Sequence, residues 1–66
     1  MKQIDQEIVS FWDRYPHGKF TAKMVTDAIG RSDHRAVEYV LQALVDDGVL
    51  EHHMNAKLVY YQRKRS

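Results

Sequence analysis

The sequence predicts an α+β fold in which three helices are followed by a β-hairpin. The first observation is a change of period at Gly48: apolar residues recur at helical spacing before it and form extended runs after it. The second is size, because 66 residues without cysteine leave room for one simple core and no disulfide or thiolate zinc site. The third is the position of the residues that interrupt helices and strands, since the one proline and the three glycines all fall between predicted elements.

The first helix is predicted over about residues 2–14. Its apolar side chains share one helical stripe, which consists of Ile4, Ile8, Phe11, Trp12 and Tyr15. Pro16 and Gly18 follow directly and end the helix, because proline disfavours helical geometry in the residue before it. We expect Trp12 to pack between this helix and the sheet.

The second helix is predicted over about residues 22–29. Thr21 precedes it and is a good N-cap, since its hydroxyl can accept a hydrogen bond from the first turn. Gly30 follows it and suits the left-handed conformation that often ends a helix. The connection to the next helix is therefore a very short turn.

The third helix is the longest and begins at a cap supplied by Ser32 or Asp33. Its core stripe consists of Val37, Val40, Leu41 and Leu44. Gly48 ends it. Tyr39 stands off this stripe, so its side chain is expected to face away from the core.

The hairpin is predicted to pair residues 49–53 with residues 58–62 through a polar tip at 54–57. The second strand is apolar at four consecutive positions, 58–61, so both of its faces carry apolar groups. Two explanations remain open. Either this strand is the centre of a small sheet whose third strand starts at Phe20, or its outer face meets a partner.

This order of elements resembles the winged helix-turn-helix superfamily, and residues 24–50 carry the resemblance. They place a small residue within the second helix, a Gly-x-Ser turn at Gly30, and the pattern Leu-x-x-x-Gly-x-Leu from Leu44 to Leu50. The resemblance covers residues 20–62, most of the chain. It implies a winged-helix domain over residues 1–62, beyond which residues 63–66 form a basic tail.

A narrower resemblance concerns the stretch from Arg35 to Glu51 and the tyrosines late in the last strand. These residues are similar to the small stand-alone winged-helix proteins of the dissimilatory sulfite reductase D type, whose size also fits. The superfamily resemblance implies a nucleic-acid or regulatory role. The narrower one allows a protein-docking module that binds or regulates a larger enzyme complex.

Charge is unevenly distributed, although ten Lys and Arg against nine Asp and Glu give a net charge of only +1. Six acidic and two basic residues lie between Asp27 and Glu51, whereas residues 55–66 hold four basic residues and no acid. Opposite fields can therefore lie on different faces of one small domain. The total charge alone points to no particular partner.

The leading functional hypothesis is a transcriptional regulator or accessory factor that binds double-stranded DNA. The resemblance implies that the third helix enters the major groove, where the Arg35 guanidinium could grip guanine O6 and N7. Asp33 and Glu38 on the same helix repel phosphate, so we expect weak, salt-sensitive affinity. The predicted nucleic-acid contacts are Thr21, Arg31, Ser32, His34, Arg35, Gln42, Asn55, Lys57, Arg63, Lys64 and Arg65.

The alternative hypothesis is a protein partner bound through an exposed tyrosine. Tyr39 is one candidate, and one of Tyr60 or Tyr61 must also face away from the core, because they are adjacent in a strand. Exposed tyrosines commonly anchor protein interfaces. We expect the chain to be a monomer or a weak homodimer.

Other classes of function are not favoured. His52 and His53 are adjacent in a strand and point to opposite faces, so they cannot easily share a metal ion. No serine, threonine or glycine-rich motif indicates catalysis, and we expect a non-enzyme without cofactor or metal. No stretch has the length of a membrane span or the apolar core of a signal peptide, so a cytoplasmic location is expected.

Overall fold

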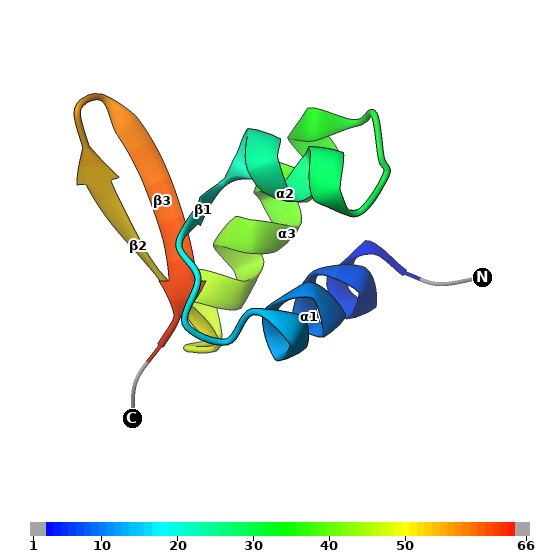
Figure 1. Ribbon diagram of the computed structural model, residues 1–66, viewed down its shortest axis with the longest axis horizontal. Coiled ribbons are helices and arrows are strands. Elements are labelled where there is room, and N and C mark those ends of the chain that lie inside the picture. Colours follow the sequence, from blue (N-terminus) through cyan, green and yellow to red (C-terminus); the bar gives the residue numbers. More distant parts are fainter. Residues whose placement is uncertain (1–2, 65–66) are drawn as a thin grey trace.

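The computed structural model describes residues 3–64 and combines three helices with a three-stranded antiparallel sheet (Figure 1). The helices are α1 (Ile4–Arg14), α2 (Ala22–Ala28) and α3 (His34–Asp46). The strands are β1 (Phe20–Thr21), β2 (Leu50–Asn55) and β3 (Leu58–Arg63). The order of elements is that of a winged helix-turn-helix, with the β2–β3 hairpin as the wing, which confirms the predicted fold class.

α2 and α3 both begin at side-chain caps. The Thr21 hydroxyl oxygen accepts a hydrogen bond from the Met24 amide at 3.2 Å, as predicted. Asp33 Oδ1 accepts one from the Ala36 amide at 3.1 Å. Of the two residues considered for the second cap, Asp33 therefore serves, because its carboxylate reaches an amide that has no partner within the helix.

A glycine with positive φ lies two residues after the last residue of each of these helices. Gly30 has φ +74° and Gly48 has φ +80°, the left-handed conformation in which other residues are strained. Helix α2 ends at Ala28, one residue earlier than predicted. The chain can therefore turn sharply after each helix, and the turn after α3 leads directly into the wing.

Strand β3 lies at the centre of the sheet, whose order is β1-β3-β2. It pairs with β1 through Phe20 and Tyr61 and with β2 through Leu50 and Arg63. The first of the two explanations for its apolar run is therefore correct. β3 also extends through Arg63, the first residue of the expected tail and one residue past the predicted end of the strand.

The wing tip differs from the prediction of a four-residue loop at 54–57. β2 continues to Asn55, which pairs with Leu58, so only Ala56 and Lys57 form the turn. Their φ values are +51° and +67°. Two consecutive positive φ values are typical of a type I′ turn, whose twist matches that of the paired strands. The short turn was missed because neither residue is the glycine or asparagine that such turns favour.

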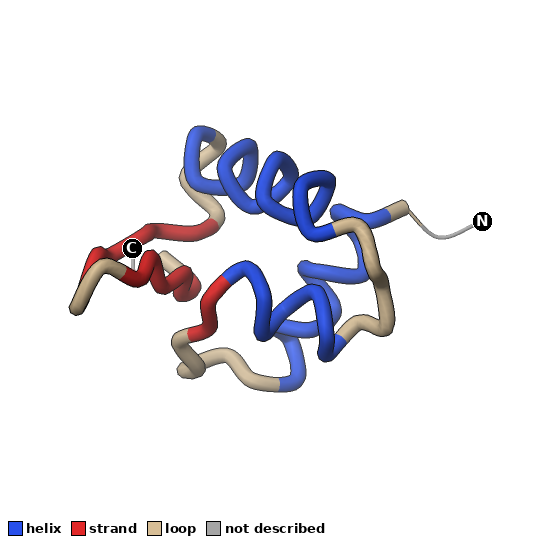
Figure 2. Tube along the Cα trace, turned by 90° about the horizontal axis from the view of Figure 1, so that it is seen from above, coloured by secondary structure: helices blue, strands red, loops and turns tan. Residues whose placement is uncertain are grey.

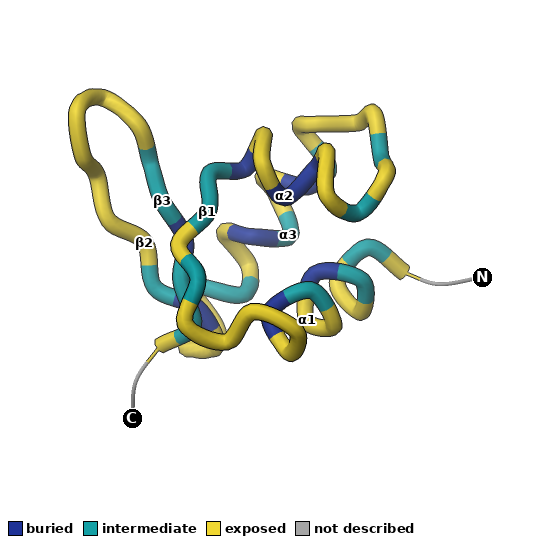
Figure 3. Tube along the Cα trace, viewed as in Figure 1, coloured by how far each residue is buried: buried dark blue, intermediate teal, exposed yellow. Residues whose placement is uncertain are grey.

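The core lies between the three helices and the base of the sheet (Figures 2 and 3). The fully buried side chains are Trp12, Ile8, Leu41, Val25 and Val37. Trp12 packs against the Phe20 ring of β1 at a centroid distance of 5.7 Å, which agrees with its predicted position between α1 and the sheet. Its indole Nε1 donates a hydrogen bond to the Gly18 carbonyl at 3.2 Å, so the buried polar atom is satisfied.

The wing is buried at its base and exposed towards its tip (Figure 3). Leu50 and Tyr61 are buried, and they lie on the face of the hairpin that packs on the helices. Met54 lies on the same face near the tip and is 75% exposed. The wing therefore projects beyond the core, and its distal half is available for contact.

Candidate functional site

An apolar groove of about 710 Å³ lies between the start of α1 and the outer side of α3. Its apolar lining consists of Ile4, Tyr39, Val40, Ala43 and Leu44. Tyr39 is 78% exposed, the highest value among the large hydrophobic side chains that the structure describes as exposed. A large aromatic side chain beside an apolar groove is a typical anchor for a protein partner.

The helical period of α3 builds this groove. Val40 and Leu44 are half-buried against the core cluster, whereas Tyr39 and Ala43, each one position earlier, are exposed on the adjoining strip of the helix. Ile4 closes the groove from α1. The small side chain of Ala43 leaves space one turn beyond Tyr39, where a partner's side chain could enter.

Charged residues at the edges of the groove are mostly acidic. Asp5 and Asp47 line it together with Arg31, which comes from the turn between α2 and α3. Arg31 is bound to the Glu7 carboxylate of α1, with Nε to Oε2 at 2.8 Å. Its charge is thus compensated, and the acidic residues dominate the rim.

The exposed polar face of α3 also carries more acid than base. His34 Nδ1 lies 3.9 Å from Glu38 Oε1, and Gln42 Nε2 donates a hydrogen bond to Asp46 Oδ1 at 3.2 Å. Arg35 is exposed in the first turn and is the single Lys or Arg within the helix. Phosphates approaching this face would meet two carboxylates for each guanidinium.

Arg31, one of the predicted nucleic-acid contacts, has an ion-pair partner within the chain. Its side chain is 35% exposed and is bonded to Glu7, 24 residues away in the sequence, so it supports the fold. Arg63 also has a partner within the chain: its Nη2 donates a hydrogen bond to Asp13 Oδ1 at 2.7 Å. Neither ion pair could be read from the sequence, because both partners lie in distant elements.

The remaining predicted nucleic-acid contacts do not gather at one place. Asn55 and Lys57 lie at the wing tip, whereas Lys64 lies at the wing base, where its amide donates to the Val49 carbonyl at 3.1 Å. A strand of this length separates tip and base by about 20 Å. Ser32 is exposed beside α3, and the Thr21 hydroxyl serves as a cap. Arg65 lies outside the described residues.

Two titratable groups of the sheet have shifted pKa values. Burial, and secondly the charge of Glu38, raise the pKa of Tyr61 above its ordinary value of 10.0. On the outer face of the hairpin, hydrogen bonds from Gln62 and then from His53 lower the pKa of Glu51 below its ordinary value of 4.5. Tyr61 thus interacts with Glu38 of α3, and Glu51 interacts with side chains of the hairpin itself. Neither Tyr61 nor Glu51 lines the apolar groove.

Two negative findings concern residues 3–64. No group of three or more His, Asp or Glu side chains there could hold a metal ion. No helix in this part of the chain is long and apolar enough to cross a bilayer.

Sequence reasoning identified Tyr39 but missed the residues around it. Ile4 and Ala43 carry no signal of their own, because Ile4 belongs to a regular core stripe and alanine is common in helices. A useful signal would have been the adjacent pairs Tyr39–Val40 and Ala43–Leu44, which widen the apolar stripe of α3. The wider stripe indicates that part of the apolar surface of α3 is not buried in the core of the domain.

The fold and groove define a class: a small winged helix-turn-helix domain with an apolar, acid-rimmed face on its third helix. No family model matches the chain, and no curated protein matches it. Among solved structures, it is similar to the neutron crystal structure of dissimilatory sulfite reductase D (DsrD), with 31% identity, a TM-score of 0.81 and 97% of each chain covered. A second crystal structure of DsrD has 30% identity and a TM-score of 0.78, over 97% of this chain and 89% of that one. The chain belongs to the dissimilatory sulfite reductase D family.

Proposed function

We propose that this chain is a non-catalytic docking module that binds a dissimilatory sulfite reductase through the outer face of α3. The observation that carries the proposal is Tyr39, which is 78% exposed at the edge of the apolar groove. The family supports the choice of partner, because the solved relatives bear the name of that enzyme. We place this interaction in the cytoplasm.

The distribution of polarity favours a protein partner over a DNA duplex. Tyr39, Val40 and Ala43 offer apolar surface, which contributes roughly 25 cal/mol per Å² when it is removed from water. The neighbouring charges of α3 are mainly acidic, and they would oppose the phosphates of a duplex. An interface centred on Tyr39 can bury the apolar strip and leave the acids at a solvated rim.

The test measures binding of the full chain to purified dissimilatory sulfite reductase by calorimetry. Wild-type protein should bind, and Tyr39→Ala should weaken binding by about tenfold or more, as expected for an aromatic anchor. Met54→Ala is the matched control, because Met54 is also an exposed apolar residue, at 75%, but lies on the wing. Its effect should stay below about twofold, the small change expected outside an interface.

DNA binding remains the second candidate function, because Arg35 is exposed in the first turn of α3 and Lys57 lies at the wing tip. This function requires duplex affinity that falls steeply with salt. Arg35→Ala combined with Lys57→Ala should then weaken duplex binding at about 50 mM salt without unfolding the domain. Duplex binding with this behaviour, together with no affinity for the reductase, would overturn the docking proposal.

A further inference from the structure

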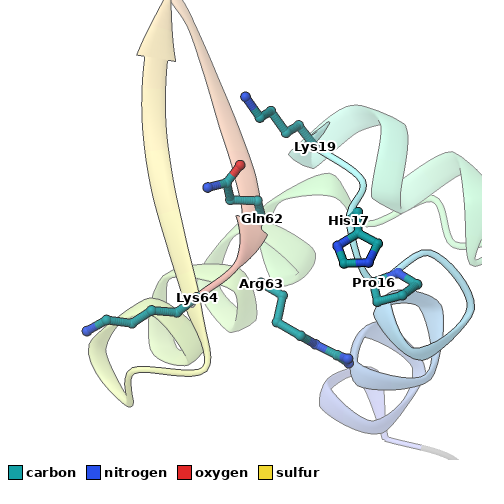
Figure 4. Close-up of a pocket in the computed structure, with 6 residues that line it drawn as sticks. All are labelled: Pro16, His17, Lys19, Gln62, Arg63 and Lys64. Atoms are coloured by element: carbon teal, nitrogen blue, oxygen red, sulfur yellow. The ribbon is translucent and has the colours of Figure 1, made fainter. Parts of the chain in front are cut away.

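A second groove, of about 460 Å³, lies between the segment that follows α1 and the end of β3 (Figure 4). Its lining residues are Pro16, His17, Lys19, Gln62, Arg63 and Lys64. Three of these side chains are cationic, those of Lys19, Arg63 and Lys64. The groove shares no lining residue with the apolar groove beside Tyr39.

Pairing within the sheet brings these cations together. Phe20 of β1 pairs with Tyr61 of β3, so Lys19, one residue before the strand, lies beside the C-terminal part of β3. Figure 4 shows Lys19, Gln62 and Lys64 reaching towards the same side, while Arg63 extends towards α1. Arg63 is held there by its hydrogen bond to Asp13. Lys19 and Lys64 therefore lie apart on one side of the groove and Arg63 lies on the other, which suits an extended ligand with more than one negative charge.

Acidic residues bound this cationic groove at both sides. Asp13 lies at the end next to α1, where it pairs with Arg63. Glu51 accepts a hydrogen bond from Gln62 on the other side. A long polyanion with a negative charge on every residue or nucleotide would extend beyond the groove and be repelled by these carboxylates. A short acidic segment would stay within the groove.

We propose that the groove between residues 16–19 and 62–64 binds a short acidic segment of a partner protein, with two carboxylates placed against Lys19 and Lys64. Gln62 lines the groove between these two lysines, and its amide nitrogen is engaged with Glu51 and lies 3.3 Å from His53 Nε2. This site goes beyond the docking surface of α3. The two grooves lie towards opposite ends of α1, a separation of about 16 Å along that helix.

The experiment uses a fluorescently labelled hexaglutamate peptide, titrated with the full chain at low salt. Lys19→Gln combined with Lys64→Gln should weaken binding about tenfold, because two direct charge contacts are lost. Lys23→Gln combined with Lys57→Gln is the matched control, since it removes the same charge from exposed positions outside the groove. The control should change affinity less than about twofold, because only long-range attraction is reduced.

Three results would overturn the proposal. The first is no binding of hexaglutamate by the wild-type chain. The second is an equal loss in both double variants, which would indicate general attraction by net charge. The third is tighter binding of a DNA duplex that is lost in the Lys19→Gln and Lys64→Gln variant, which would make the groove a nucleic-acid site. Thermal melts of all variants report whether each remains folded.

Discussion

Arg31 joins the turn between α2 and α3 to the first helix by donating from Nε to Oε2 of Glu7 at 2.8 Å. Both side chains are partly shielded, with exposed fractions of 35% and 20%. The contact links residues 24 positions apart and fixes α1 against the helix-turn-helix unit. A residue whose type and position suit DNA binding thus supports the tertiary structure.

Glu7→Gln should lower the free energy of unfolding by about 1 kcal/mol, because a partly shielded, charge-assisted hydrogen bond is weakened. Asp13→Asn is the control. It removes the partner of Arg63 at an exposed position and should cost less than about 0.5 kcal/mol, as exposed ion pairs contribute little. Urea unfolding at neutral pH measures both. Equal effects of the two substitutions would show that the Arg31–Glu7 pair has no special role.

Lys57→Gly should stabilise the domain by about 1 kcal/mol, because Lys57 has φ +67° and only glycine adopts this conformation without strain. Lys57→Ala is the matched control, since it removes the same charge but keeps the Cβ atom. It should give no comparable gain. Thermal unfolding of the three proteins tests the prediction, and equal stability of the glycine and alanine variants would contradict it.

The turn of the wing is a feature that could not be predicted from the sequence, in contrast to several others. The helices, the cap at Thr21 and the glycines that follow α2 and α3 could be predicted because each depends on residues close in the chain. For the same reason the cap of α3 could be narrowed to Ser32 or Asp33. The apolar run of β3 left two explanations open, a central strand or a partner on its outer face, and the strand order decides for the first. The two-residue turn could not be predicted, because pairing of the strands imposes positive φ on Ala56 and Lys57 against their own preference.

The candidate site was less predictable than the fold. Tyr39 could be identified as exposed because it lies off the core stripe of α3. The groove beside it depends on Ile4 of α1, and the pairing of Arg31 with Glu7 depends on how two distant elements pack. Contacts of this kind follow from tertiary structure, so charge and spacing in the sequence overstated the basic surface near α3.

Tyr61→Phe should reduce the loss of stability in alkaline solution. Burial raises the pKa of Tyr61 in the folded protein, with a further contribution from Glu38. The stability linked to the protonated hydroxyl is therefore fully present below the unfolded-state pKa of about 10 and is lost as pH rises through the folded value. Unfolding free energies measured between about pH 8 and 11 should fall less steeply in Tyr61→Phe than in the wild type.

Glu38→Gln provides the companion measurement for this titration. It removes the nearby negative charge but leaves Tyr61 buried, so it should recover only part of the alkaline stability. An identical pH dependence in the wild type and Tyr61→Phe would show that this hydroxyl does not titrate differently in the folded and unfolded states.

The most direct test of the docking account is the change in hydrogen exchange of α3 when the chain is mixed with purified dissimilatory sulfite reductase. Protection should increase in the segment around Tyr39 and Ala43 and in the first turn of α1 beside Ile4, because these residues line the same groove. The wing tip at residues 54–57 should be unchanged. Protection at the wing tip and around Arg35 with none around Tyr39 and Ala43, or no protection at all, would contradict the account.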